Sequence, residues 1–170
     1  MIHVDDLTRL SARERDTAEK EVVRIYATAG VHAIWRDGLP LADETRAGTR
    51  AHVTVAILDA RATERTTAGE PWDSKIIGRA ARAAGRAYIF YPRLELAARF
   101  HGRHVGMVLG AAMAHEVGHL LLSKNSHSNV GIMGDDLNLK ALLPLGVLGF
   151  TPAQSAEIRN ALRTWPHRVR

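Results

Sequence analysis

The sequence predicts an α+β fold in which a small mixed or antiparallel sheet packs on an N-terminal helix and a central helix, with a further helix near the C-terminal end. Apolar residues recur at helical spacing near 11–30, 104–122 and 151–163, and short β-branched or aromatic runs lie between the first two of these stretches. A chain of 170 residues is long enough for one real core and too short for two. We therefore expect a single domain over 1–170.

The N-terminal helix is predicted to begin at Ser11, because Ser11 and Glu14 have the spacing of a capping box. Gly30 is a natural C-terminal stop. The apolar residues between these two ends fall on one helical stripe, as expected of a helix that packs on a core: Ala18, Val22, Ile25, Tyr26 and Ala29.

Short strands are predicted between the N-terminal and central helices. The run at 51–58, AHVTVAIL, is rich in β-branched residues, and the run at 87–91, AYIFY, is aromatic and apolar on both faces. Shorter strands are expected at 31–35 and 75–78. Residues 59–75 contain many turn-forming residues, so we expect a loop there.

The central helix is predicted from His104 to about residue 122, and it is the most apolar helix of the chain. Gly106, Gly110 and Gly118 lower its helix propensity but allow neighbouring backbone to approach closely. We therefore expect a buried helix at the centre of the fold.

The last helix is predicted from Thr151 to about Arg163. Pro152 occupies its first position, and Gln154 completes a capping box with Thr151. Beyond these elements the sequence contains no repeat, no low-complexity tract and no internal linker.

The composition narrows the class of protein. There are no cysteines, so disulfides and thiolate metal ligands are both excluded. The net charge of +5 raises the question of nucleic acid, but the densest arginine run, GRAARAAGRA at 78–87, has no aromatic residue to stack on bases. We expect a solvated arginine-rich surface and no nucleic-acid partner.

No targeting or membrane segment is expected. Residues 1–25 are charged and lack the apolar core of a signal peptide, so the compartment is unknown, with secretion favoured if a signal has been removed. The most apolar helix carries His115, Glu116 and His119, which are costly in lipid. The sequence carries no signal for the oligomeric state.

The stretch HEVGHLLLSKNSH, at 115–127, carries the chemistry. On a helix, the side chains of His115 and His119 are about 400° apart around the helix axis, a little more than one full turn. They therefore face the same way and can bind one zinc ion. The side chain of Glu116 is about 100° from that of His115 around the helix axis. It is too far round to be a ligand on the same stripe but close enough to reach a water beside the metal. The spacing predicts a zinc site with Glu116 as the base that activates water.

A third ligand is needed to complete such a site. His127 follows His119 by eight residues and lies beyond the predicted helix end, where a chain reversal would return it to the metal. Zinc prefers nitrogen donors, and three histidines leave one position open for water, so we favour His127. Asp135, Asp136 and, on the last helix, Glu157 are the alternatives.

The order of these elements resembles the metzincin clan of zinc endopeptidases. That clan has the pattern H-E-x-x-H-x-x-G-x-x-H followed by a tight turn containing a methionine, and Met133 in GIMGD is similar to that Met-turn residue. Leu122 stands where the pattern has glycine, and Asn125 where it has the third histidine. The loop is therefore two residues longer and brings the histidine to position 127, with Asn125 expected to shape the turn.

The resemblance implies one zincin-like catalytic domain that holds one zinc ion per chain through His115, His119 and His127. It implies hydrolysis of a peptide or protein, with Glu116 as general base and Met133 supporting the metal site. By the same resemblance, the strand 87–91 is the edge that pairs with substrate, and 137–150 shapes an apolar pocket or else belongs to the core or a partner surface. The alternatives are a catalytically idle binding module and a zinc hydrolase acting on a non-peptide amide.

Overall fold

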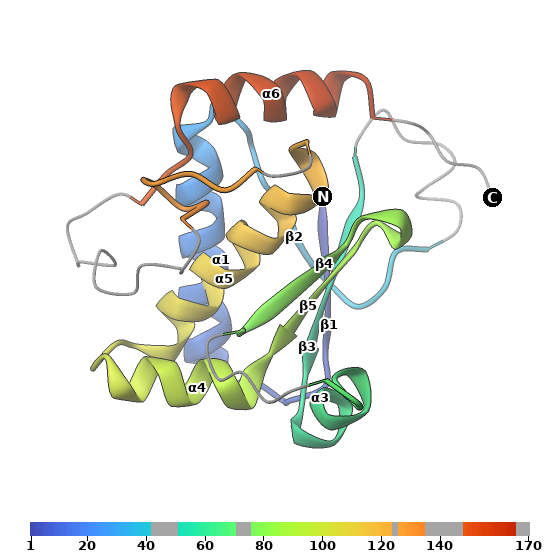
Figure 1. Ribbon diagram of the computed structural model, residues 1–170, viewed down its shortest axis with the longest axis vertical. Helices are drawn as coiled ribbons and strands as arrows, with labels where there is room; N and C mark the ends of the chain where they lie inside the picture. The colour runs from blue at the N-terminus through green and yellow to red at the C-terminus, as the bar shows by residue number, and fades with distance from the viewer. Residues whose placement is uncertain (42–50, 71–75, 124–125, 135–147, 166–170) are drawn as a thin grey trace.

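A computed structural model describes residues 1–41, 51–70, 76–123, 126–134 and 148–165. Within them lies a mixed five-stranded sheet of order β2-β1-β3-β5-β4, which confirms the predicted α+β class (Figure 1). The strands are β1 (Ile2–Asp6), β2 (Trp35–Asp37), β3 (Val53–Leu58), β4 (Gly78–Ala81) and β5 (Arg86–Phe90). The helices are α1 (Ala12–Thr28), α3 (Ala60–Thr66), α4 (Tyr91–Phe100), α5 (Val105–Leu121) and α6 (Pro152–Arg163), with a 3-10 turn at Arg82–Ala84.

The sheet has two unequal faces. Strands β2, β1, β3 and β5 are parallel, and β4 is antiparallel to β5 at one edge. Alternate residues such as Val55 and Ile89 enter the main core beneath α1 and α5, whereas Leu58 and Phe90 enter a small cluster on the side of α3. The larger core therefore lies on the face that also carries the central helix.

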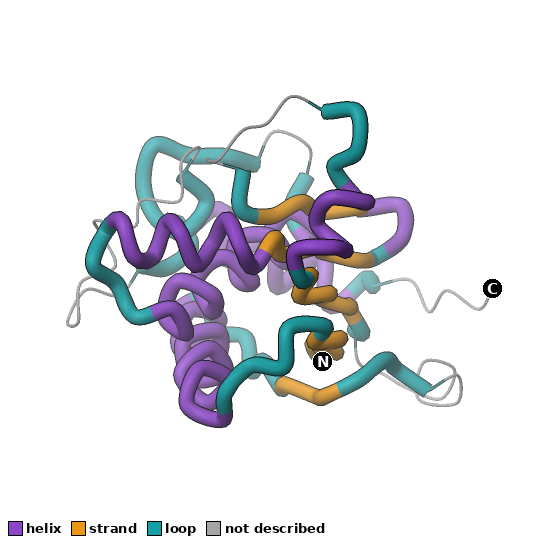
Figure 2. Tube along the Cα trace, turned by 90° about the horizontal axis from the view of Figure 1, so that it is seen from below, coloured by secondary structure: helices purple, strands orange, loops and turns teal. Residues whose placement is uncertain are grey.

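Helices α1 and α5 lie side by side against the sheet (Figures 1 and 2). Two glycines of α5 make this close approach possible. A Cβ atom built on Gly106 would lie 2.7 Å from the carbonyl oxygen of Glu14, and one on Gly110 would lie 2.6 Å from that of Ala18. The predicted buried helix with close backbone neighbours is therefore confirmed.

Both predicted capping boxes are present. The Ser11 hydroxyl and the Glu14 carboxylate cap the start of α1, and Thr151 and Gln154 cap the start of α6 in the same way. Helix α6 crosses above α1 and α5 (Figure 1), and Arg159 on it donates a hydrogen bond of 2.7 Å to the carbonyl of Ala29. The capping signals thus fixed the starts of these two helices correctly.

Several predicted strands are displaced. The strand expected at 31–35 is β2 at Trp35–Asp37, and the one expected at 75–78 is β4 at Gly78–Ala81. The prediction that 87–91 forms the sheet edge is wrong, because β5 lies between β3 and β4. The edge strand beside the central helix is β4.

Three elements were not predicted. Strand β1 pairs with β2 and β3, and helix α3 begins at the cap residue Asp59 inside the stretch expected to be a loop. Helix α4 follows β5 directly, with Pro92 in its first turn. In the part of the chain that the structure describes, no helix is both long and apolar enough to cross a membrane.

Candidate metal centre

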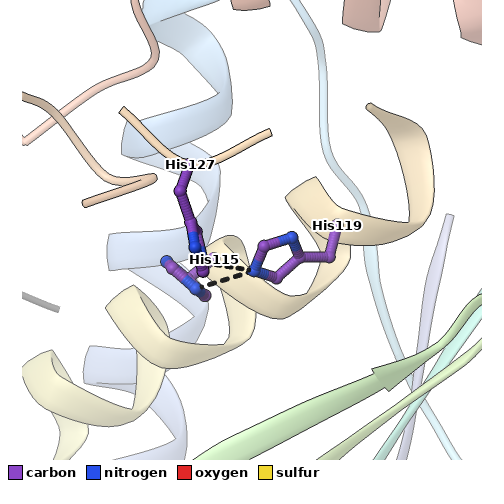
Figure 3. Close-up of side chains that lie close together, drawn as sticks. All are labelled: His115, His119 and His127. Carbon is purple, nitrogen blue, oxygen red and sulfur yellow. Dashed lines mark hydrogen bonds between the residues drawn. The ribbon is translucent and has the colours of Figure 1, made fainter. Parts of the chain in front are cut away.

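Three histidines from two segments meet at one point. His115 and His119 lie one turn apart on α5, and His127 lies on the loop that follows it (Figure 3). The Nε2 atom of His119 is 3.0 Å from that of His115 and 3.0 Å from that of His127. Among the described residues, these three form the group able to share a metal ion, with ligand atoms all within 4.8 Å of one another.

The hydrogen bonds on the far side of each ring orient the donors. His115 Nδ1 is 2.8 Å from the carbonyl oxygen of Ile132, which can only accept, so Nδ1 carries the proton and Nε2 keeps a free lone pair. His119 Nδ1 lies 3.0 Å from the Ser126 hydroxyl oxygen, which can likewise accept a hydrogen bond from it. Such outer contacts are what fixes a ligating histidine in other metal sites.

The imidazoles of His115 and His119 favour their neutral form. Burial lowers the pKa of His115; its hydrogen bond to the Ile132 carbonyl opposes that effect, and the nearby His127 adds to it. Burial also lowers the pKa of His119 to about 4, helped by the charges on His115, His127 and Arg82. Neutral imidazole is the form that binds a metal, so protons compete weakly for these two donors at neutral pH.

These residues fit a zinc ion. Two nitrogens bound to one tetrahedral zinc at about 2.0–2.1 Å lie about 3.3 Å apart, close to the 3.0 Å separations of the Nε2 atoms. The set has three imidazole nitrogen donors and no thiolate, and catalytic zinc sites of this kind leave the fourth position open. His115 is buried, whereas His127 is exposed, so the site is reached from solvent on the loop side.

Glu116 lies beside the histidines and faces strand β4. Its side chain is buried, and a Cβ atom built on Gly78 would lie 2.8 Å from Glu116 Oε1. Glycine at position 78 therefore leaves the space that the carboxylate occupies. Burial raises the pKa of Glu116 to about 8; the nearby positive charge of Arg79 opposes that rise, and the charge of a metal ion held by the histidines would oppose it further.

A cleft of about 380 Å³ joins the histidines to the sheet edge. Its walls come from α5, from strand β4 with the residues on either side of it, and from the loop that carries His127. The residues that line it beside the three histidines and Glu116 are Ile76, Ile77, Gly78, Arg79, Ala80, Arg82 and Ala112. A substrate in this cleft would contact β4 and the histidine cluster together.

Met133 is fully buried against the helix that carries the histidines. A Cβ atom built on Gly118 would lie only 2.6 Å from its sulfur, so glycine is needed there for the methionine to approach α5. Its chain segment turns at Gly131, whose φ is +82°, and the Gly134 amide donates back to the Gly131 carbonyl over 3.4 Å. The contact with Gly118 places Met133 against the turn of α5 between the two histidines.

Helix α6 holds both ends of the loop that carries His127. Near the start of the loop, the Ser123 amide donates to the Glu157 carboxylate. Near the other end, the Gln154 amide nitrogen donates to the Ser126 carbonyl over 3.0 Å and to the Ser128 hydroxyl over 3.2 Å. Gln154 is buried, and its oxygen caps α6, so one side chain joins the helix start to both neighbours of His127.

Replacing Gln154 with Glu is expected to weaken zinc binding about tenfold, as loss of an outer contact does in other metal sites. Glu suits this capping position, but it cannot donate to the Ser126 carbonyl. The dissociation constant for zinc, measured by chelator competition, would detect the change, and thermal unfolding would report the helix. Gln154→Ala is the comparison, since it loses both the donor and the cap. Unchanged zinc affinity in Gln154→Glu would contradict this role.

The structure separates the candidate third ligands. His127 lies in the cluster, whereas Glu157, an alternative from sequence, instead accepts a hydrogen bond from the Ser123 amide. Asp135, Asp136 and Asn125 lie outside the described residues. Of the stretch 137–150, the part from 148 is described, and Leu148 and Phe150 are in the hydrophobic core.

Sequence reasoning missed two residues of the cleft. Arg79 and Arg82 belong to the arginine-rich run that we interpreted as a solvated surface, yet both line the cleft. Nothing in their spacing marks them, because their position depends on the pairing of β4 with β5. Only the pairing of these two strands could have revealed both arginines, and strand pairing is a tertiary feature that the local sequence does not show.

No protein-family model matches the chain, and no curated protein matches its sequence significantly. A solved structure is similar in fold: the crystal structure of a zinc-dependent peptidase from Methanocorpusculum labreanum (strain Z). The TM-score is 0.55 and the identity 15%, over 93% of this chain and 100% of the other. The chain therefore has an α+β fold similar to that of a zinc-dependent peptidase, with a histidine triad suited to zinc at the centre of its cleft.

Proposed function

We propose that this chain is a zinc-dependent endopeptidase of the metzincin type. The observation that carries the proposal is the meeting of His115, His119 and His127 beside the buried carboxylate of Glu116 in one cleft. The similar fold of a zinc-dependent peptidase supports the same reaction class. In this proposal the three histidines hold the metal, and Met133 supports the helix beneath them.

Each group has a separate task in the proposed reaction. When bound, zinc supplies the positive charge that lets water lose a proton near neutral pH and that polarises a carbonyl group. Glu116 takes that proton and later returns it to the departing amine, which is why a carboxylate is required rather than an amide. Gly78 leaves the space for this side chain, and the buried wall of α5 around it keeps it oriented.

Strand β4 supports a peptide as the substrate. It is the edge strand of the sheet on the side of the cleft, and its outer edge pairs with no other strand among the described residues. Gly78, Arg79 and Ala80 of this strand also line the cleft. An extended peptide could add to this edge through main-chain hydrogen bonds, with its scissile bond facing the histidines.

Protein purified without added metal is expected to contain about one zinc per chain, because three imidazoles converge on one point. Elemental analysis measures this, and a digest of casein or of a peptide library tests hydrolysis by the same sample. Protein without zinc that takes up none on addition would contradict the proposal. Protein that binds zinc but leaves peptides intact would instead indicate an idle binding module or a hydrolase of another amide.

A further inference from the structure

Two arginines flank the cleft where a substrate would enter beside β4. Arg79 lies on β4 and Arg82 in the 3-10 turn that follows, and both line the cleft with the histidines. Arg79 forms an ion pair with Glu70, including a hydrogen bond of 2.8 Å, and its guanidinium lies over the ring of Phe90. The charge of Arg79 is therefore largely compensated within the protein.

Arg82 differs from Arg79 in this respect. Its side chain is exposed and forms no hydrogen bond or ion pair with any described residue. It is nevertheless close enough to the cluster for its charge to act on His119. A cation at the rim of the cleft is thus available to an incoming group.

The charges around the cleft favour an anionic ligand. Of the described residues that line it, Glu116 is the only acid, and its side chain is buried. A bound zinc ion would add positive charge to that of Arg82. Arginine also presents a planar fork of donors that matches a carboxylate, so a carboxylate is the anion that best fits this position.

We propose that Arg82 binds a carboxylate of the substrate, so that the cleft selects peptides that carry an acidic group beside the scissile bond. The proposal rests on the peptidase function proposed above and adds the substrate class. The carboxylate can come from an acidic side chain or from the C-terminus of a peptide. Arg82 is a specificity-determining residue in this scheme, and the histidines and Glu116 remain the reacting site.

The test uses four matched peptides with one cleavable bond. The neighbouring residue is Glu or Gln, and the C-terminus is free or amidated. We expect kcat/KM to be about tenfold higher with a carboxylate than without one, as for hydrogen bonds to charged groups. Preference for Glu over Gln in amidated peptides identifies a side-chain carboxylate, whereas preference for free over amidated ends in the Gln pair identifies the terminus.

Variants assign the preference to a residue. Arg82→Ala is expected to abolish the roughly tenfold preference, and Arg82→Glu to reverse it in favour of the neutral peptides. Arg65 on α3 is exposed and outside the cleft lining, so Arg65→Ala is the matched control and should keep the preference. High salt should weaken the preference of the parent protein, because the contact is exposed.

The outcomes separate the two proposals. If the parent cleaves acidic and neutral peptides equally well, or Arg82→Ala keeps the preference, the role of Arg82 is overturned and the peptidase function stands. If no peptide is cleaved, the proposed peptidase function fails. The proposed role of Arg82 can then still be tested by measuring the binding of the peptides. Calorimetry of the same peptides with zinc-loaded Glu116→Gln should then show about tenfold tighter binding of the carboxylate forms. Equal binding would overturn the role of Arg82.

Discussion

Replacing Glu116 with Gln is expected to reduce peptide hydrolysis at least about a hundredfold while the protein keeps its zinc. The amide has nearly the shape of the carboxylate and fits the space that Gly78 leaves. The amide cannot take a proton from water, so the variant loses the base of the hydrolytic step and nothing else. The readouts are kcat/KM with a peptide substrate and zinc content by elemental analysis.

The matched control is Glu64→Gln, which makes the same chemical change at an exposed position on α3. It should leave both hydrolysis and zinc content at the parent values. Hydrolysis by Glu116→Gln at the parent rate would refute the proposed role of this carboxylate, even if the metal were present. Loss of zinc from Glu116→Gln would show that position 116 acts on the metal site rather than on water.

Replacing His127 with Ala is expected to lower zinc affinity by more than about a hundredfold and to remove nearly all activity. Loss of a residue that only orients a metal ligand lowers metal affinity about 10- to 100-fold. Loss of His127 should cost more, because it is proposed to bind the metal directly. Its Nε2 lies 3.0 Å from that of His119. Among the described residues, the group of possible ligands contains no further side chain that could take its place. Chelator competition measures the affinity.

His101, at the end of α4, provides the control, since it lies outside the cluster and the cleft lining. His101→Ala should bind zinc like the parent. From sequence, Asn125→Ala is also expected to keep zinc, because an amide oxygen competes poorly with imidazole. If His127→Ala binds zinc like the parent, Asp135 and Asp136 become the ligands to test.

The parts of the fold that the sequence predicted best are those with local signals. The capping residues at Ser11 and Thr151 marked two helix starts, and the long apolar run around His115 marked the central helix. The spacing of His115 and His119 was sufficient because four residues of helix bring the rings together wherever the helix lies. These predictions required no knowledge of the rest of the chain.

The missed elements are short or have mixed signals. Strand β1 has only Ile2 and Val4 as buried apolar residues, and its stability comes from pairing with both neighbouring strands. Helix α4 continues directly from the aromatic run of β5, so its start at Tyr91 looked like the end of a strand. Local propensity is weak in such places, and the tertiary partners decide the structure.

The arrangement of the cleft depends on sheet order, which no single segment encodes. β5 is more apolar than β4, and the sequence favours it as the edge, although β4 pairs with it on its outer side. That order places Arg79 and Arg82 at the cleft and Gly78 against Glu116. The sequence therefore predicted that His115, His119 and His127 meet, but not which other residues line the cleft beside them.

The contacts of α6 with the His127 loop have a consequence for the timing of synthesis. A ribosome completes α5, with His115 and His119, well before it reaches Gln154. Until α6 docks, Ser126 and Ser128 lack the hydrogen bonds that Gln154 donates to them on either side of the third histidine. A nascent chain without α6 would hold His127 less firmly, so the proposed peptidase would gain its fully ordered site only after its last helix has been made.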